Sequence, residues 1–154
     1  MDRWRGFNEE LEQNGIGQKS KILFLDKRTS SQAETTYLAL RQLGCDGFVL
    51  IKDSDSFFNL NLDATDNQVA YFNLDLSKHI TPGSKSYIQM DSNRILTNIV
   101  EKKVVSSFFS VGGYGFENAS EFCSTYEKII ELETSEEIYI SHVIFEMILS
   151  GSTF

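Results

Sequence analysis

Two aspartates, one residue apart, are the strongest candidates for chemistry in this sequence. Asp53 and Asp55 follow directly after the apolar run at residues 48–51. A short apolar run bounded by turn residues is typical of a buried strand, and open α/β sheets bind ligands beyond the carboxyl ends of such strands. Two carboxylates placed there suit Mg²⁺ or Mn²⁺, which binds carboxylates together with the phosphate oxygens of a substrate. The alternative is an acidic turn without function, because Asp and Ser are common turn residues.

The aspartates need a sheet to position them, and the preceding pattern predicts one. Residues 22–25 have the composition of a short apolar strand. Ser31 and Glu34 have the spacing of a capping box, which predicts a helix from there to a stop at Gly44. The strand that ends at Asp53 follows. This strand–helix–strand order predicts a parallel, right-handed βαβ unit.

The remainder of the chain predicts more strands and helices, with a hairpin among them. The predicted elements are a helix at 3–13, strands at 69–72, 86–90, 94–100 and 107–114, and helices at 118–132 and 134–148. The expected fold is therefore an α/β domain with a mixed, mostly parallel central sheet and flanking helices. The last helix is apolar nearly all round, which predicts that it is buried or is covered by another chain.

Composition limits the classes of function. The chain has 154 residues, enough for one domain with a full core, and a hydrophobic content of 41%. A net charge of −8 argues against nucleic-acid binding, although a few cations and a metal could hold a nucleotide. Two cysteines make no disulfide framework, and no signal peptide or membrane-spanning run is visible. These features predict a cytoplasmic protein without nucleic-acid or membrane partners.

Four segments, in this order and spacing, resemble the sugar-nucleotide nucleotidyltransferases and their glycosyltransferase-A-type relatives. They are residues 32–36, 51–55, the hairpin of residues 91–102 that ends in Glu101-Lys102, and residues 111–116. The resemblance covers about residues 21–154. It implies a single nucleotidyltransferase-like domain at 1–154, truncated at both ends and incomplete relative to the family, because the family's N-terminal glycine-rich phosphate loop has no match here.

The resemblance also implies a role for each segment. Asp53 and Asp55 would hold Mg²⁺ or Mn²⁺, and Asp55 and Lys102 would be catalytic, with Lys102 at a phosphate. The residues implied to bind the nucleotide or the sugar are Gln32, Ala33, Glu34, Thr35, Glu101, Gly112 and Gly113.

Structural alternatives to these roles remain open. Glu34 could serve only to cap its helix, and residues 101–103 could be a solvated strand end. Gly112 and Gly113 could mark a bulge rather than a surface that a sugar approaches.

The implied reaction transfers a nucleotidyl group from a nucleoside triphosphate to a sugar phosphate, for capsule or other surface-polysaccharide synthesis. Weak or no turnover is expected of this chain alone, because the phosphate loop has no match. A homodimer or a completing chain would be a further partner. The alternatives are a metal-dependent glycosyltransferase that uses a nucleotide sugar, for which D-x-D is the metal motif, and a non-catalytic interaction module. A phosphatase of the haloacid-dehalogenase type is disfavoured, because there the D-x-D strand usually opens the domain.

Overall fold

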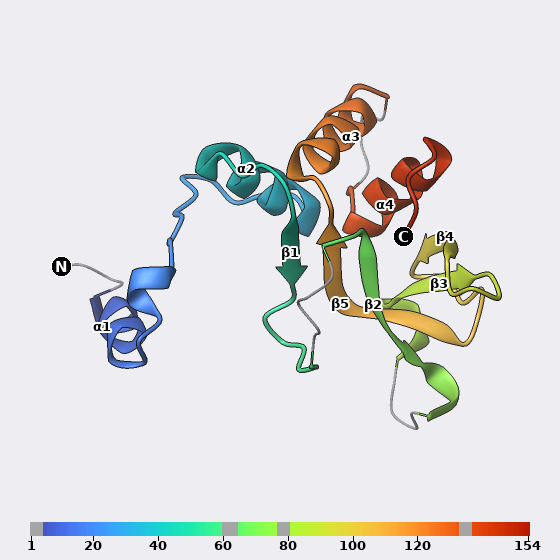
Figure 1. Cartoon of the computed structure of the whole chain (residues 1–154), viewed down its shortest axis with the longest axis horizontal. Coiled ribbons are helices and arrows are strands. Elements are labelled where there is room, and N and C mark those ends of the chain that lie inside the picture. Colours follow the sequence, from blue (N-terminus) through green and yellow to red (C-terminus); the bar gives the residue numbers. More distant parts are fainter. Residues whose placement is uncertain (1–4, 60–64, 77–80, 133–136) are drawn as a thin grey trace.

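A computed structural model describes residues 5–59, 65–76, 81–132 and 137–154. Three helices pack together beside a sheet of five strands, and the N-terminal helix lies apart from them on an extended segment (Figure 1). The elements are α1 (Arg5–Gln13), α2 (Gln32–Leu43), β1 (Val49–Lys52), β2 (Gln68–Asn73), β3 (Ser86–Met90), β4 (Leu96–Glu101), β5 (Phe108–Phe116), α3 (Ala119–Leu132) and α4 (Ile140–Leu149). Among the described residues, no helix has the length and apolar content that crossing a bilayer requires.

All the strand pairs described are antiparallel. The sheet order is β1-β5-β3-β4, and β2 also pairs with β5. The α/β class and the flanking helices are confirmed, but the prediction of a mostly parallel sheet is wrong. Residues 22–25 form no strand, and β1 pairs antiparallel with β5, with Val49 opposite Phe116. An apolar run predicts a strand but does not identify its neighbour, and the nine-residue β5 is the partner that β1 takes here.

Local signals set the limits of α2 as the sequence predicts. Ser31 is the N-cap, and its hydroxyl accepts a hydrogen bond from the Glu34 amide at 3.1 Å. Gly44 ends the helix in the left-handed conformation at φ +63°, which glycine adopts without steric cost. The predicted hairpin is also confirmed as the antiparallel pair β3–β4.

The start of the last helix differs from the prediction. Part of the predicted segment 134–148 lies outside the described residues, and the first helical residue is Ile140 rather than Glu137 or an earlier one. Tyr139 caps this helix, and its amide donates to His142 Nδ1 at 3.4 Å. His142 thus has a structural contact within the helix end.

A bulge in β5 shapes the strand beside β1. Ala70 of β2 pairs with Gly113, but the next residue, Tyr71, pairs with Ser110. Residues 111 and 112 of β5 are therefore skipped, and Gly112 has φ +80°, a value that favours glycine. The bulge interpretation is confirmed for Gly112, whereas Gly113 pairs with Ala70 at the edge of the bulge.

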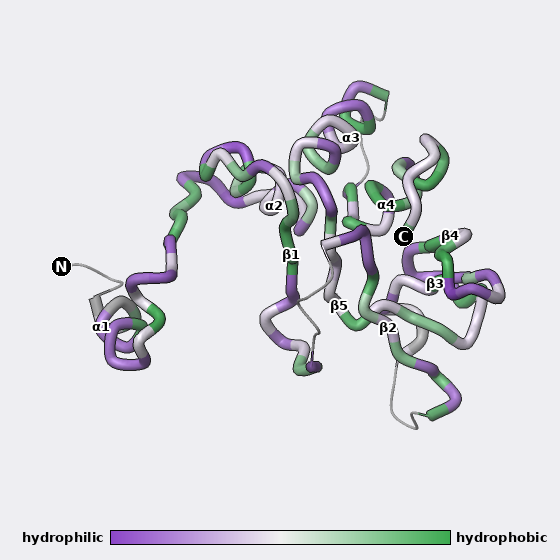
Figure 2. Tube along the Cα trace, in the orientation of Figure 1, coloured by the Kyte–Doolittle hydropathy of each residue, from purple (hydrophilic) through white to green (hydrophobic). Residues whose placement is uncertain are grey.

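The core lies between the sheet and the three packed helices. Phe116 of β5 is fully buried, and its ring contacts those of Phe122 and Phe154, with centroids 4.9 Å and 5.9 Å away. α4 buries one face and leaves Phe145 and Leu149 exposed. Figure 2 shows hydrophobic residues along β1 and hydrophilic ones along much of α1. Burial of aromatic and aliphatic side chains is the main source of stability here.

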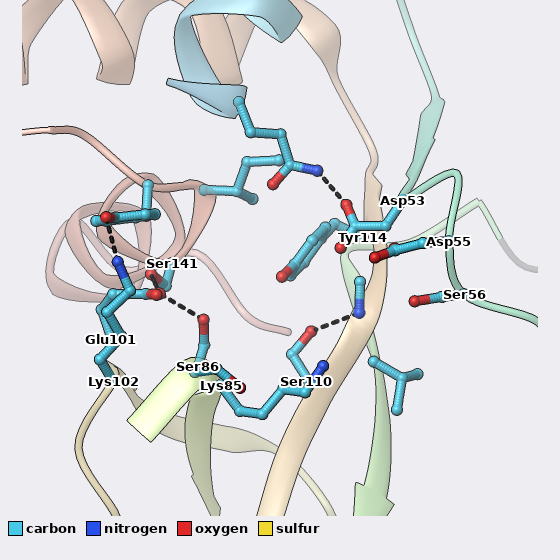
Figure 3. A pocket seen from close by; sticks show the side chains of 16 residues that line it. Asp53, Asp55, Ser56, Lys85, Ser86, Glu101, Lys102, Ser110, Tyr114 and Ser141 are labelled. Carbon is cyan, nitrogen blue, oxygen red and sulfur yellow. Dashed lines mark hydrogen bonds between the residues drawn. The ribbon is translucent and has the colours of Figure 1, made fainter. Parts of the chain in front are cut away.

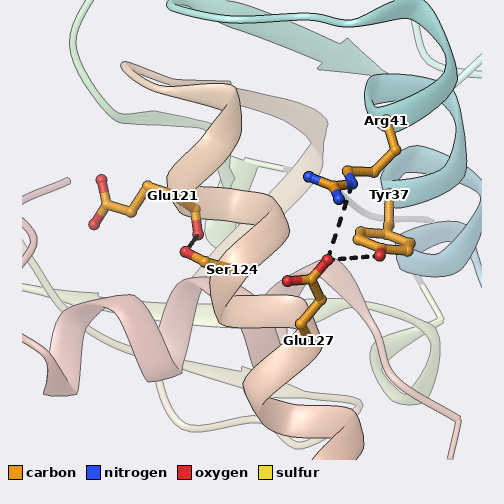
Figure 4. Close-up of polar contacts among 5 residues, drawn as sticks. All are labelled: Tyr37, Arg41, Glu121, Ser124 and Glu127. Atoms are coloured by element: carbon orange, nitrogen blue, oxygen red, sulfur yellow. Dashed lines mark hydrogen bonds and ion pairs between the residues drawn. The ribbon is translucent and has the colours of Figure 1, made fainter.

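Polar contacts hold α2 against α3 (Figure 4). The Tyr37 hydroxyl donates to Glu127 Oε1 at 2.6 Å, and Arg41 Nε lies 4.0 Å from the same oxygen. The Tyr37 ring also stacks on Tyr126 at 4.9 Å between centroids. The hydrogen bond to Glu127 raises the pKa of Tyr37, since it stabilises the protonated phenol. These contacts fix the helix whose first residue is Gln32.

Candidate functional site

One cavity, of about 270 Å³, collects residues from distant parts of the chain (Figure 3). It lies where the ends of β1 and α2 meet the bulge of β5, the β3–β4 hairpin and the start of α4. The residues with a sequence-predicted role that line it are Gln32, Asp53, Asp55, Glu101, Lys102 and Gly112. The tertiary structure therefore brings the predicted metal-binding and phosphate-binding residues to one surface, with some of those predicted to bind the nucleotide or the sugar.

Asp53 is anchored from two sides. Its amide donates to the Gly112 carbonyl at 2.8 Å, and its Oδ1 accepts a hydrogen bond from Gln32 Nε2. Its Oδ2 lies only 2.1 Å from where a Cβ on residue 112 would stand, so glycine is required there. Asp55, two residues on, is exposed at the cavity wall.

The pKa of Asp53 is raised above the usual aspartate value. Burial is the largest cause, and the nearby charge of Asp55 adds to it. The Gln32 hydrogen bond and the positive charges of Lys85 and Lys52 oppose the increase. A divalent cation between the two carboxylates would relieve their repulsion.

Glu101 is held in place by two serine hydroxyls. Its Oε2 accepts from Ser86 at 2.5 Å and from Ser141 at 2.6 Å. Ser86 stands opposite Glu101 in the β3–β4 register, whereas Ser141 comes from α4, 40 residues further along the chain. One carboxylate oxygen is fixed by these bonds, and the other is oriented with it.

Lys102 follows β4 in a left-handed backbone conformation, φ 55°. Its ammonium donates to the Tyr139 hydroxyl and lies 4.0 Å from the centre of the Tyr139 ring. The hydrogen bond with Tyr139 is the largest cause of a raised pKa for Lys102, which therefore stays charged. Lys102 lines the cavity, but its charge already has a partner in Tyr139.

Four predicted site residues lie elsewhere. Ala33 is fully buried in the core. The Glu34 carboxylate accepts from the Ser30 amide and hydroxyl at 2.5 and 2.7 Å, which lowers the pKa of Glu34 and supports a helix-capping role. The Thr35 hydroxyl donates to the Ser31 carbonyl at 3.0 Å. A Cβ on Gly113 would stand 2.5 Å from the Phe58 ring, so the missing side chain of this glycine leaves room for Phe58 rather than for a sugar.

Several cavity residues were not identified from the sequence. They are Ser56, Ser84, Lys85, Ser86, Ser110, Tyr139, Ile140 and Ser141, whereas Val111 and Tyr114 belong to the segment 111–116 that carries the resemblance. The hairpin register could have indicated Ser86, because it pairs with Glu101. No local pattern indicates Tyr139 or Ser141. Burial raises the pKa of Tyr114 to about 12, so its hydroxyl remains protonated.

The acid pair fits a hard divalent cation bound in part by a ligand. Among the described residues, no cluster of three or more acidic, histidine or cysteine side chains could enclose a metal. Asp53 and Asp55 would supply two oxygens at an open cavity, which leaves positions for phosphate oxygens and water. This is the coordination that Mg²⁺ commonly takes at phosphate-transfer sites.

Two solved structures share the fold of this chain. The chain superimposes on the nucleoside-diphosphate-sugar pyrophosphorylase from Vibrio cholerae RC9 with a TM-score of 0.77 at 20% identity, covering 99% of this chain and 67% of that one. It also matches the inositol-1-phosphate CTP transferase from T. maritima, with a TM-score of 0.70 at 16% identity, covering 99% and 61%. No protein-family model and no curated protein sequence matches the chain. At these identities the likeness concerns the fold.

Proposed function

We propose that this chain is a nucleotidyltransferase-type domain, which transfers a nucleotidyl group from a nucleoside triphosphate to a sugar phosphate. The observation that supports this most strongly is the single cavity that joins Asp53 and Asp55 to Glu101 and Lys102. The two structural neighbours carry names of nucleotide-transfer enzymes, one for nucleotide sugars and one for a phosphorylated polyol. They are longer than this chain, so the proposal extends to their activity only by analogy of fold.

The cavity residues would divide the work between charge and orientation. Asp53 and Asp55 would hold Mg²⁺ or Mn²⁺, which supplies neutralisation of phosphate charge. Glu101, fixed by its two serines, would accept hydrogen bonds from sugar hydroxyls. The amide of Gln32 would stay on Asp53 and hold the carboxylate toward the cavity. Such catalysis depends mainly on positioning and electrostatic stabilisation.

Isothermal titration calorimetry tests the proposal directly. The wild-type chain should bind a nucleoside triphosphate in the presence of Mg²⁺, and chelation of the metal should abolish binding. The double variant Asp53→Asn, Asp55→Asn should lose at least about tenfold in affinity, because it removes both charged ligands of the metal on which phosphate binding depends. Asp75→Asn, at an exposed aspartate outside the cavity, is the matched control. Unchanged binding in the double variant would refute the site.

A glycosyltransferase that uses a nucleotide sugar is the second candidate. The observation in its favour is that both carboxylates of the D-x-D segment line the cavity. Incubation with nucleotide sugars should release a nucleoside diphosphate if this candidate holds. Pyrophosphate release from a triphosphate and a sugar phosphate instead supports the leading proposal, even if turnover is weak. A cytoplasmic role in capsule or surface-polysaccharide synthesis belongs to the same proposal, since nucleotide sugars are the donors for such polymers.

The unpaired edge of β1 is a surface where the homodimer partner or completing chain expected from the sequence could pair. Among the described strands, β1 pairs only with β5, and Val49, Leu50 and Ile51 are half-buried. A sheet edge of this kind can pair with another strand. A homodimer or a completing chain thus stays a prediction, and sedimentation equilibrium of the purified chain tests it. A monomer at all concentrations would contradict the homodimer.

A further inference from the structure

Lys85 lines the cavity, and no sequence pattern indicates a role for it. It stands just before β3, and its carbonyl accepts a hydrogen bond from the Lys102 amide at 3.0 Å. This bond fixes the backbone from which the Lys85 side chain departs. Figure 3 shows that side chain extending from the wall that carries Ser86 toward Ser110. Lys85 lines the same cavity as Asp53 and Asp55.

The two cavity lysines differ in what they already contact. Lys102 is hydrogen-bonded to Tyr139 and lies over its ring. Among the residues that the structure describes, the Lys85 ammonium has no hydrogen-bond or ion-pair partner. Lys85 is also half-buried, whereas Lys102 is exposed. A half-buried ammonium is less screened by solvent and can donate all its hydrogens to a ligand.

The charges of the cavity indicate what this ligand is. Three carboxylates face two ammonium groups in the cavity wall, so the empty site carries one net negative charge. A divalent cation on Asp53 and Asp55 would reverse the sign and make the site attractive to an anion. Lys85 would then face a second cation, and only an anion that both can share removes their repulsion. A phosphate group has the oxygens to contact both at once.

We propose that Lys85 is the main phosphate-binding lysine of this cavity, and that Lys102 is a positioning residue tied to Tyr139. This inference rests on the proposed function, and it names the group that receives the substrate's phosphate. It also predicts that phosphate ligands bind only together with the metal.

Binding of inorganic pyrophosphate in Mg²⁺ tests the proposal, because this probe depends on neither base nor sugar. Calorimetry should show that Lys85→Gln weakens binding at least about tenfold, whereas Lys85→Arg retains it to within about threefold. Lys102→Gln should change the affinity less than about threefold, since its charge is engaged elsewhere. Lys103→Gln, at the exposed neighbour outside the cavity, should have no effect. Thermal unfolding of each variant verifies that it folds.

The outcomes separate this inference from the proposed function. If the wild type binds pyrophosphate, Asp53→Asn loses it and Lys85→Gln keeps it, then the Lys85 assignment is wrong and the proposed function stands. A larger loss in Lys102→Gln than in Lys85→Gln overturns the assignment as well. If the wild type binds no pyrophosphate in Mg²⁺, both proposals fail together.

Discussion

Asp53 connects stability and function at the scale of a single residue. Its carboxylate is partly buried, close to Asp55, and oriented by Gln32. Burial and the neighbouring Asp55 disfavour the charge, the Gln32 hydrogen bond opposes them only in part, and a bound cation would compensate the rest. The ionised carboxylate is thus unfavourable in the empty site, and a bound cation would stabilise it. Titratable groups with shifted pKa values are common at functional sites.

Asp53→Asn should stabilise the folded chain at neutral pH. The pKa of Asp53 is raised above its ordinary value of 3.8, so the folded state binds the proton more tightly than the unfolded state. At a pH above the raised pKa, the charged Asp53 therefore lowers the free energy of unfolding. This loss disappears as the pH falls through the raised pKa toward the unfolded value. Chemical denaturation at pH 7 should show a gain of less than about 1 kcal/mol, because the side chain is partly solvated. A gain that persists unchanged at pH 3 would contradict this cause.

The same raised pKa predicts how metal affinity depends on pH. Protons compete with the cation for Asp53, and they do so at a higher pH than for an ordinary aspartate. Titration with Mn²⁺ should show affinity falling on acidification before a typical carboxylate titrates. The Asp53→Asn variant should lose the part of the pH dependence that comes from Asp53. The part that remains is the contribution of Asp55.

Gly112→Ala should disrupt the site through the backbone. A Cβ at this position would stand 2.1 Å from Asp53 Oδ2, and φ is +80°. We expect a loss of about 1–3 kcal/mol in stability, together with loss of Mg²⁺-dependent binding. Gly83→Ala is the control, because a Cβ there meets nothing within 4 Å. Equal effects in both variants would exclude the proposed crowding against Asp53.

At the scale of elements, the docking of α2 on α3 determines where Gln32 lies. Tyr37→Phe removes the hydrogen bond to Glu127 but keeps the ring that stacks on Tyr126. Denaturant unfolding should show a loss of about 1 kcal/mol, the usual net value of such a bond. Tyr71→Phe, on an exposed ring of β2, should stay within about 0.5 kcal/mol of the wild type. If both variants unfold alike, the interhelical bond does not contribute.

At the scale of the whole molecule, one aromatic cluster joins β5 to α3 and to the last residue. Phe116 is fully buried between Phe122 and Phe154. Phe116→Ala should cost about 3–5 kcal/mol, a large share of the stability of an ordinary domain. The milder Phe116→Leu keeps the chain folded for measurement. Phe57→Ala, at a side chain that is 97% exposed, is the matched control and should be nearly neutral.

The sequence by itself determined most of the elements and the chemistry they could carry, although no strand forms at residues 22–25. Capping residues fixed α2, the hairpin pattern fixed β3 and β4, and an apolar run followed by two acids identified Asp53 and Asp55. These signals are local, because they depend on residues that are neighbours along the chain. The resemblance to a known family, rather than a local pattern, indicated Gln32, Glu101 and Lys102, which the structure places around one cavity.

Only the tertiary structure decided which strands pair and which side chains meet. The antiparallel pairing of β1 with β5 depends on contacts more than 60 residues apart along the chain, and no local pattern encodes them. The place of Lys85 in the cavity also depends on tertiary structure, because the hairpin and the hydrogen bond from the Lys102 amide position it. Ser141 reaches Glu101 from a helix 40 residues away. Local propensity selects the elements, whereas burial and long-range pairing select their arrangement.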